Sequence, residues 1–296
     1  MALARVDNYK LGEKNAFLGI IGNVFLFAVK LAAGIAGRSQ AMIADAFHTA
    51  SDSATSLGVL IGFKIASRPA DDHHPYGHGR AESIMAKLVA IVLIGVGLGI
   101  AYSSARVLVS GEFEAPGRIA LIVAVISIVV KELVYRRVVS AGKSIGSSSL
   151  KADAYHHRSD AISSVAALAG IAAARMGKPF MDPLAGIIVA GFVVKMGIEA
   201  FHEAYDELMD AAPPDELRKK ITDITLTAEG VLTVKKVMVR KAGIDLYPEI
   251  TIGVDGEKKV KEGHLVTMKV KQELCRRMNN LKDIVVHVEP VKVNGR

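Results

Sequence analysis

Residues 44–56, ADAFHTASDSATS, place His48 and Asp52 four residues apart in an apolar segment of about residues 41–66. A second stretch, ADAYHHRSDAISS at residues 152–164, repeats this spacing with His156 and Asp160 in a segment of about residues 149–174. Residues four apart share one face of an α-helix. Each segment therefore predicts a helix that carries one imidazole and one carboxylate side by side.

The chain around these two stretches has the composition of a membrane protein. Of its 296 residues, 51% are hydrophobic and 23% are charged, and the mean hydropathy is +0.32. A helix that crosses a bilayer needs about 20 mostly apolar residues. Six segments approach this length, at about residues 15–36, 41–66, 82–108, 117–137, 149–174 and 183–205. We therefore predict a six-transmembrane-helix bundle over residues 1–208.

The two His/Asp pairs are expected at one depth. With a rise of about 1.5 Å per residue, all four side chains fall within roughly two turns of the bilayer centre. Two antiparallel helices can then close a single site. Two imidazoles and two carboxylates suit tetrahedral Zn²⁺, with Fe²⁺, Co²⁺ and Cd²⁺ as alternatives. The single cysteine excludes a cysteine-rich metal site, and we expect no organic cofactor.

The summed charge of the metal and its four ligands suggests how such a site could bind and release a cation. Neutral histidines, two ionised aspartates and Zn²⁺ sum to zero, and protons replace the metal when it leaves. A site that takes either a divalent cation or protons is what metal/proton antiport requires. Isolated polar residues in the same segments more often form helix-packing hydrogen bonds, which is the interpretation favoured for Asp45, Asp153, His157 and His202. For Lys30 we expect a cavity-facing or helix-pairing role.

The distribution of basic residues indicates the orientation. The connections with more Lys and Arg should face the cytoplasm, which places both termini inside a multi-pass protein of the inner (cell) membrane. The formal net charge of +7 lies mostly beside the apolar segments. We therefore expect the lipid bilayer, and no nucleic acid, as a partner. No removable signal peptide is predicted in the first 14 residues.

The composition changes at about Asp210, where a small cytoplasmic domain over residues 209–296 is predicted. Periodicity predicts helices at 215–230 and 261–278 and strands at 231–240, 246–255 and 283–290. This order suits a small sheet with helices on one face. Between the second and third apolar segments, SRPADDHHPYGHGRAES at residues 67–83 carries Asp71, His74 and His78. Their spacing predicts a second metal site near the cytoplasmic surface, and the alternative is a solvated loop with unrelated histidines.

These motifs together resemble the cation diffusion facilitator family of divalent-metal transporters. The resemblance rests on ADAFHTASD, PADDHHPYGHGRAES, KADAYHHRSD, DPLAG at the start of the sixth segment, and the tail. It implies a ferredoxin-like (αββαβ) α+β tail and a homodimer that exports metal from the cytoplasm against protons by alternating access. By the resemblance, the transport site is formed by His48, Asp52, His156 and Asp160, and the loop site by Asp71, His74 and His78.

The resemblance also extends to charged residues outside these two sites. Arg80 and Asp210 match positions that form an inter-subunit charge pair in relatives. Lys235 and Thr251 stand where relatives with a metal-bridged tail have histidines. A lysine adds positive charge and offers no lone pair at neutral pH. The expected tail site is therefore reduced to His264, His287 and Glu289.

Three other functions are compatible with parts of the sequence. Within the transporter class, the chain could export Mn²⁺ or Fe²⁺ instead of Zn²⁺. A membrane metallohydrolase would need an open metal position and a general base, whereas four protein ligands close the site and neither HExxH nor GxSxG occurs. We therefore predict that the protein is not an enzyme. The third alternative is a membrane metal sensor or scaffold that does not transport.

Overall fold

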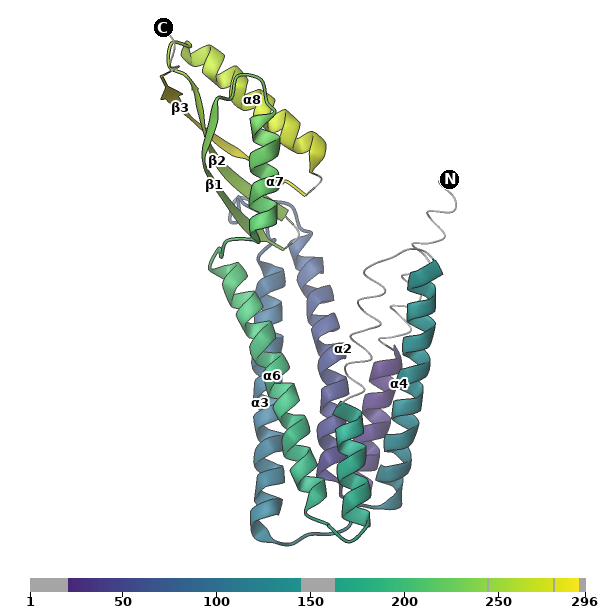
Figure 1. Cartoon of the computed structure of the whole chain (residues 1–296). Coiled ribbons are helices and arrows are strands. Elements are labelled where there is room, and N and C mark those ends of the chain that lie inside the picture. The colour runs from purple at the N-terminus through teal and green to yellow at the C-terminus, as the bar shows by residue number, and fades with distance from the viewer. Residues whose placement is uncertain (1–20, 145–162, 244, 279, 293–296) are drawn as a thin grey trace. The chain divides into compact units, whose positions relative to one another are not determined.

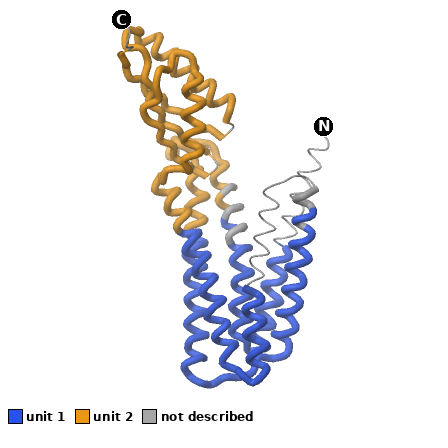
Figure 2. The backbone as a smooth tube through the Cα atoms, in the orientation of Figure 1, with its two compact units in different colours: residues 1–58, 88–201 blue, residues 59–87, 202–296 orange. Residues whose placement is uncertain are grey.

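The computed structural model describes residues 21–144, 163–243, 245–278 and 280–292 (Figure 1). His156 and Asp160 of the predicted transport site lie outside the described residues, as do Asp153 and His157. The chain divides into two compact units (Figure 2). The first unit comprises residues 1–58 and 88–201, and the second comprises residues 59–87 and 202–296.

Helices occupy the predicted apolar segments. They are α2 (Gln40–Ala66), α3 (Ala81–Ser110), α4 (Arg118–Ser144) and α6 (Met181–Leu208), together with two shorter helices, Ile21–Ala36 and Ser163–Arg175. Helix α4 runs seven residues past its predicted end at residue 137, and near that end Glu132 and Arg136 form an ion pair at 2.7 Å. Among the described residues, α3 and α6 are long and apolar enough to cross a membrane.

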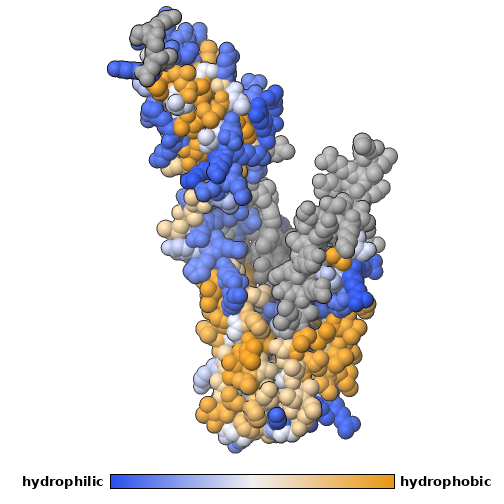
Figure 3. All heavy atoms as spheres, viewed as in Figure 1, coloured by the Kyte–Doolittle hydropathy of each residue, from blue (hydrophilic) through white to orange (hydrophobic). Residues whose placement is uncertain are grey.

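Small residues and an apolar exterior characterise the first unit. Buried alanines dominate its core cluster, and a Cβ atom added at Gly170 would lie 2.2 Å from the Cβ of Ala185. Such contacts let helix backbones approach closely, as in membrane bundles. Large apolar side chains point outward from α3 and α4, including Val92, Ile122 and Leu133, and they cover much of these helices on the face shown in Figure 3. This surface suits contact with lipid.

A carboxylate from α6 closes the N-terminal end of α2. Asp182 is 2% exposed and accepts hydrogen bonds from Ser39 Oγ at 2.6 Å and from the backbone N–H of Gln40 at 2.7 Å. Ser39 Oγ in turn accepts the backbone N–H of Met42 at 3.1 Å. A serine cap and a negative charge both satisfy the first turn of a helix. The beginnings of α2 and α6 are thereby tied together.

The second unit contains a three-stranded sheet in the order β1 (Thr233–Ala242), β2 (Asp245–Asp255) and β3 (Val285–Val291). β1 and β2 are antiparallel, and β2 and β3 are parallel. Helices α7 (Asp215–Leu226) and α8 (Val260–Arg277) lie on one side of this sheet (Figure 1). They bury Ile221, Val270 and Leu274 against Ile250 and Ile252 of β2. The predicted order of helices and strands is confirmed.

Several boundaries in the tail differ from the prediction by two residues or more. Helix α7 ends at Leu226 instead of residue 230, and β1 begins at Thr233 instead of residue 231. The connection turns at Gly230, whose φ of +95° is a left-handed conformation that glycine adopts without strain. Helix α8 begins where predicted because the backbone N–H of Lys259 donates to Glu262 Oε2 at 2.9 Å, which caps the first turn.

Candidate metal centre

Helix α2 brings His48 and Asp52 to one face in the interior of the first unit. His48 is 4% exposed, and Asp52 is partly buried. A histidine and an ionisable carboxylate in an apolar helical bundle are costly and need a functional or structural reason. The two residues supply one imidazole and one carboxylate, which is half of the predicted ligand set. The whole four-residue site stays a prediction.

Asp45, one turn before His48 on α2, forms a buried ion pair with Lys30 of the helix Ile21–Ala36. Lys30 Nζ and Asp45 Oδ2 are 2.7 Å apart, and both side chains are fully buried. The Lys30 ammonium also donates to Thr49 Oγ1 at 3.0 Å and to Ser164 Oγ at 3.2 Å, while Ser164 Oγ donates to Asp45 Oδ1 at 2.8 Å. These contacts join α2 to the helices Ile21–Ala36 and Ser163–Arg175. Asp45 and Lys30 therefore have the helix-pairing role that the sequence favours.

Sequence reasoning missed a second buried lysine. Lys131 lies in α4 and is 5% exposed, and within the described ranges its Nζ has no hydrogen-bond partner. Its charge acts on Lys30 and Asp45, and the charge of Asp52 acts on Lys30. The sequence predicts that the fourth apolar segment is an ordinary membrane span without a buried charge. The structure differs, because Lys131 is buried there. Lys131 therefore adds a positive charge to the interior of the first unit, near Lys30 and Asp45.

The loop between α2 and α3 assembles Asp71, His74 and His78. One potential ligand atom from each lies within 4.8 Å of the others, and this is the one such group found in the described part of the chain. Asp71 Oδ1 is 3.1 Å from His74 Nδ1, and Asp71 Oδ2 is 3.4 Å from His78 Nε2. The neighbouring His73 is not part of the group. The predicted loop residues thus converge.

A turn preorganises the carboxylate of this group. The backbone N–H groups of His73 and His74 donate to Asp71 Oδ1 at 3.0 Å and 2.7 Å. The hydrogen bond from the His74 backbone lowers the pKa of Asp71 below its usual value. The carboxylate is therefore ionised, and available to a cation, through the neutral and mildly acidic range.

We expect His74→Ala or His78→Ala to weaken Zn²⁺ binding at the loop by at least about tenfold, because each variant removes one of three ligands. His73→Ala is the matched control and should leave the affinity unchanged. Isothermal titration of the purified protein with Zn²⁺ would measure both effects. Equal affinities in all three variants would contradict the assignment.

Arg80 and Asp210 form an ion pair within one chain. Arg80 Nη2 lies 2.6 Å from Asp210 Oδ1, and both side chains are about half exposed. The expectation from the resemblance was a pair between subunits. Asp210 lies two residues after the end of α6 and Arg80 directly precedes α3, and the inter-subunit pair stays a prediction.

His287 and Glu289 lie together, with His287 Nε2 3.8 Å from Glu289 Oε1, but within the described part of the chain they do not form a three-residue group with His264. His264 lies on α8 and borders a cavity with Val286 and Val288, whereas His287 lies on the alternate side of β3. Lys235 Nζ contacts Glu289 Oε2 at 2.5 Å and holds the pKa of Glu289 below its usual value. Glu289, one of the three expected tail ligands, is thus already in an ion pair with Lys235. Thr251 pairs with His287 across the sheet and adds no ligand.

Family comparisons agree with these features. The Cation efflux transmembrane domain family matches residues 16–209, and the family described as Cation efflux protein, cytoplasmic domain, matches residues 213–291. Together they account for the helical part and for the sheet with its two helices. The chain belongs to the cation diffusion facilitator family, whose members are membrane transporters.

Individual relatives extend over nearly the whole chain. An uncharacterized transporter of Methanocaldococcus jannaschii is 35% identical over 94% of this chain and 98% of that protein. Manganese efflux system protein MneP of Bacillus subtilis is 30% identical over 96% of this chain and 98% of that protein. Metal tolerance protein C1 of Arabidopsis thaliana is 34% identical over 94% of this chain, which spans 62% of that protein. A solved structure of the MamM CTD is 23% identical over 26% of this chain, with a TM-score of 0.26.

Proposed function

We propose that this protein exports divalent metal ions, with Zn²⁺ as the preferred substrate, from the cytoplasm in exchange for protons. The observation that carries the proposal is the buried His48 and the partly buried Asp52 on one face of α2, inside an apolar bundle. His156 and Asp160 complete the site in this proposal. Two imidazoles and two carboxylates form a closed four-ligand set that suits Zn²⁺.

Proton coupling follows from the charges of the proposed site. When a dication leaves a set of two histidines and two aspartates, the remaining negative charge is expensive in an apolar interior. Protons on these side chains reduce that cost, so metal and protons compete for the same groups. Lys131 offsets part of the remaining charge. The empty, partly protonated site is therefore stable enough to return to the cytoplasmic side.

The architecture in this proposal is a homodimer. Residues 1–208 form six membrane-spanning helices and residues 209–296 form a ferredoxin-like cytoplasmic domain, with both termini in the cytoplasm of a cell whose inner membrane holds the protein. Transport proceeds by alternating access, in which helices rock around a fixed central site. The loop triad Asp71, His74 and His78 receives metal at the cytoplasmic entrance.

Mn²⁺ export is the second candidate function, and a specific observation favours it. The relative MneP is named as a manganese efflux protein and is aligned over nearly its full length. Mn²⁺ prefers oxygen ligands, whereas imidazoles favour Zn²⁺ and Cd²⁺. Because the proposed site contains His48 and His156, it should bind Zn²⁺ more tightly than Mn²⁺. The affinity for Fe²⁺ should be intermediate.

The experiment is metal uptake by proteoliposomes that contain the purified protein and an imposed pH gradient. We expect Zn²⁺ flux driven by the gradient, stronger competition by Cd²⁺ than by Mn²⁺, and collapse of flux when an ionophore removes the gradient. Stronger competition by Mn²⁺ would favour the second candidate. Absence of flux for all four metals Zn²⁺, Cd²⁺, Fe²⁺ and Mn²⁺ would contradict export and favour a metal sensor or scaffold.

A further inference from the structure

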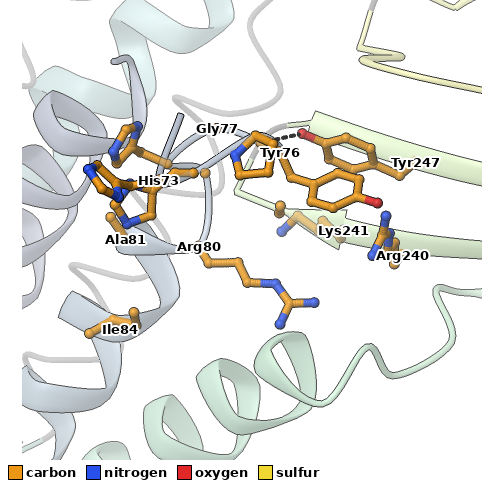
Figure 4. A pocket seen from close by; sticks show the side chains of 14 residues that line it. His73, Tyr76, Gly77, Arg80, Ala81, Ile84, Arg240, Lys241 and Tyr247 are labelled. Atoms are coloured by element: carbon orange, nitrogen blue, oxygen red, sulfur yellow. Dashed lines mark hydrogen bonds between the residues drawn. The ribbon is translucent and has the colours of Figure 1, made fainter. Parts of the chain in front are cut away.

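A cavity of about 550 Å³ lies beside the loop triad in the second unit (Figure 4). One wall is the loop and the start of α3, including Tyr76 and Arg80, and the other wall is the end of β1 and Tyr247 of β2. Figure 4 shows His73, Tyr76 and Arg80 on the loop side and Arg240, Lys241 and Tyr247 on the sheet side. This volume is far larger than a single metal ion needs and is in the range of small-molecule sites.

The walls of this cavity are basic. Arg80, Arg240 and Lys241 line it together with three histidines, and its lining contains no aspartate or glutamate. Asp210 offsets the charge of Arg80, and Glu207 offsets that of Lys241 at 3.2 Å. Arg240 has no carboxylate within ion-pair distance among the described residues, and its Nε is buried without a hydrogen-bond partner there. One positive charge is therefore left for a ligand.

The unpaired guanidinium is held in place by aromatic rings. The Cζ atom of Arg240 lies 5.0 Å from the ring centre of Tyr76 and 5.4 Å from that of Tyr247. The Tyr247 hydroxyl donates to the backbone oxygen of Tyr76 at 3.0 Å, which ties the two rings' segments together. Stacking fixes the plane of a guanidinium and leaves its N–H donors free for a carboxylate or phosphate. Arg240 is thus prepared to recognise an anion.

The adjacent triad offers such an anion a second partner. His74 and His78 border the same cavity, and three protein ligands leave one position of a four-coordinate metal open. A bare dication gains nothing from the basic walls, whereas an anion does. We propose that the cavity binds a small anion with carboxylate or phosphate groups through Arg240 and Lys241. When the loop holds metal, as the proposed function requires, this anion supplies the fourth ligand.

The test is anion binding to the full-length protein in nanodiscs of neutral lipid, measured by equilibrium dialysis with radiolabelled citrate and with inorganic phosphate, without metal. We expect saturable binding by the natural protein and an at least tenfold weaker affinity for Arg240→Gln. Arg240→Lys should be intermediate, because lysine keeps the charge but lacks the planar fork. Lys236→Gln removes a charge from the same strand outside the cavity and should match the natural protein.

Two further arms identify the source of the anion and check folding. If anionic lipid in the nanodiscs displaces citrate, the ligand is a lipid headgroup, and if it does not, the ligand is a free anion. Zn²⁺ binding at the loop by Arg240→Gln should be unchanged without anion, which shows that the variant is folded. No saturable anion binding by the natural protein, or equal binding by folded Arg240→Gln, would overturn the inference. Metal flux in the separate proteoliposome assay decides the proposed function independently.

Discussion

His48→Ala is expected to reduce proton-driven Zn²⁺ flux in proteoliposomes by at least about a hundredfold. Loss of a residue that only supports a metal ligand costs 10–100-fold in affinity, and His48 is proposed as a ligand itself. Asp52→Asn should have a similar effect, because an amide keeps the shape of the side chain but removes its negative charge. Asp160→Ala tests the other half of the set. The dimer should persist in all three variants.

The matched control for this series is His202→Ala, which removes an imidazole from a neighbouring helix outside the proposed site. It should transport at the natural rate. His48→Asp adds sharper information, because it exchanges a nitrogen ligand for oxygen and should shift the competition series towards Mn²⁺. Full flux by His48→Ala or by Asp160→Ala would contradict the site assignment. An unchanged metal preference in His48→Asp would contradict the proposal that the imidazole determines metal selectivity.

Breaking the buried pair of Lys30 and Asp45 is expected to have the largest effect on stability. Lys30→Met leaves Asp45 ionised and fully buried, with Ser164 as its remaining side-chain donor among the described residues. Removal of one partner from a buried ion pair costs about 3–5 kcal/mol of unfolding free energy. Asp45→Asn should cost a similar amount. Denaturant unfolding of the purified protein in detergent would measure these values.

The double variant separates the pair from other causes. Lys30→Met with Asp45→Asn removes both charges, so it should be clearly more stable than the sum of the single losses predicts. Arg136→Ala is the control, since it breaks an exposed pair with Glu132 and should cost less than about 1 kcal/mol. Additive losses in the double variant would show that the two side chains stabilise the bundle independently.

Periodicity and segment length predict the elements of this fold well. The boundaries of α2, α3 and α8 lie within two residues of their expected positions, because long apolar or amphipathic patterns determine them locally. Errors occur where a single residue ends an element, as at Gly230 after α7. The convergence of Asp71, His74 and His78 is also local, since an eight-residue stretch and one Asx turn produce it.

Long-range electrostatics could not be predicted in the same way. A hydropathy count accepts one lysine in an apolar segment, so Lys131 passes unnoticed even though it is buried. The cavity depends on Tyr247 reaching a backbone oxygen 171 positions away, at Tyr76. No spacing rule connects two such residues. The sequence did contain a signal for this residue, because Lys131 directly follows the mostly apolar residues 119–130. A charged side chain in a membrane segment is costly and indicates a functional or structural role.

The cap that Asp182 places on α2 makes that end of the helix a pivot. With a rise of about 1.5 Å per residue, His48 lies about 12 Å and Asp52 about 18 Å from the capped residue Gln40. A tilt of α2 about this point therefore moves the carboxylate about half as far again as the imidazole. A tilt of about 10° displaces Asp52 by roughly 3 Å, while metal–ligand distances tolerate about 0.2 Å. A small tilt at one end of α2 would thus be enough to open the proposed ligand set.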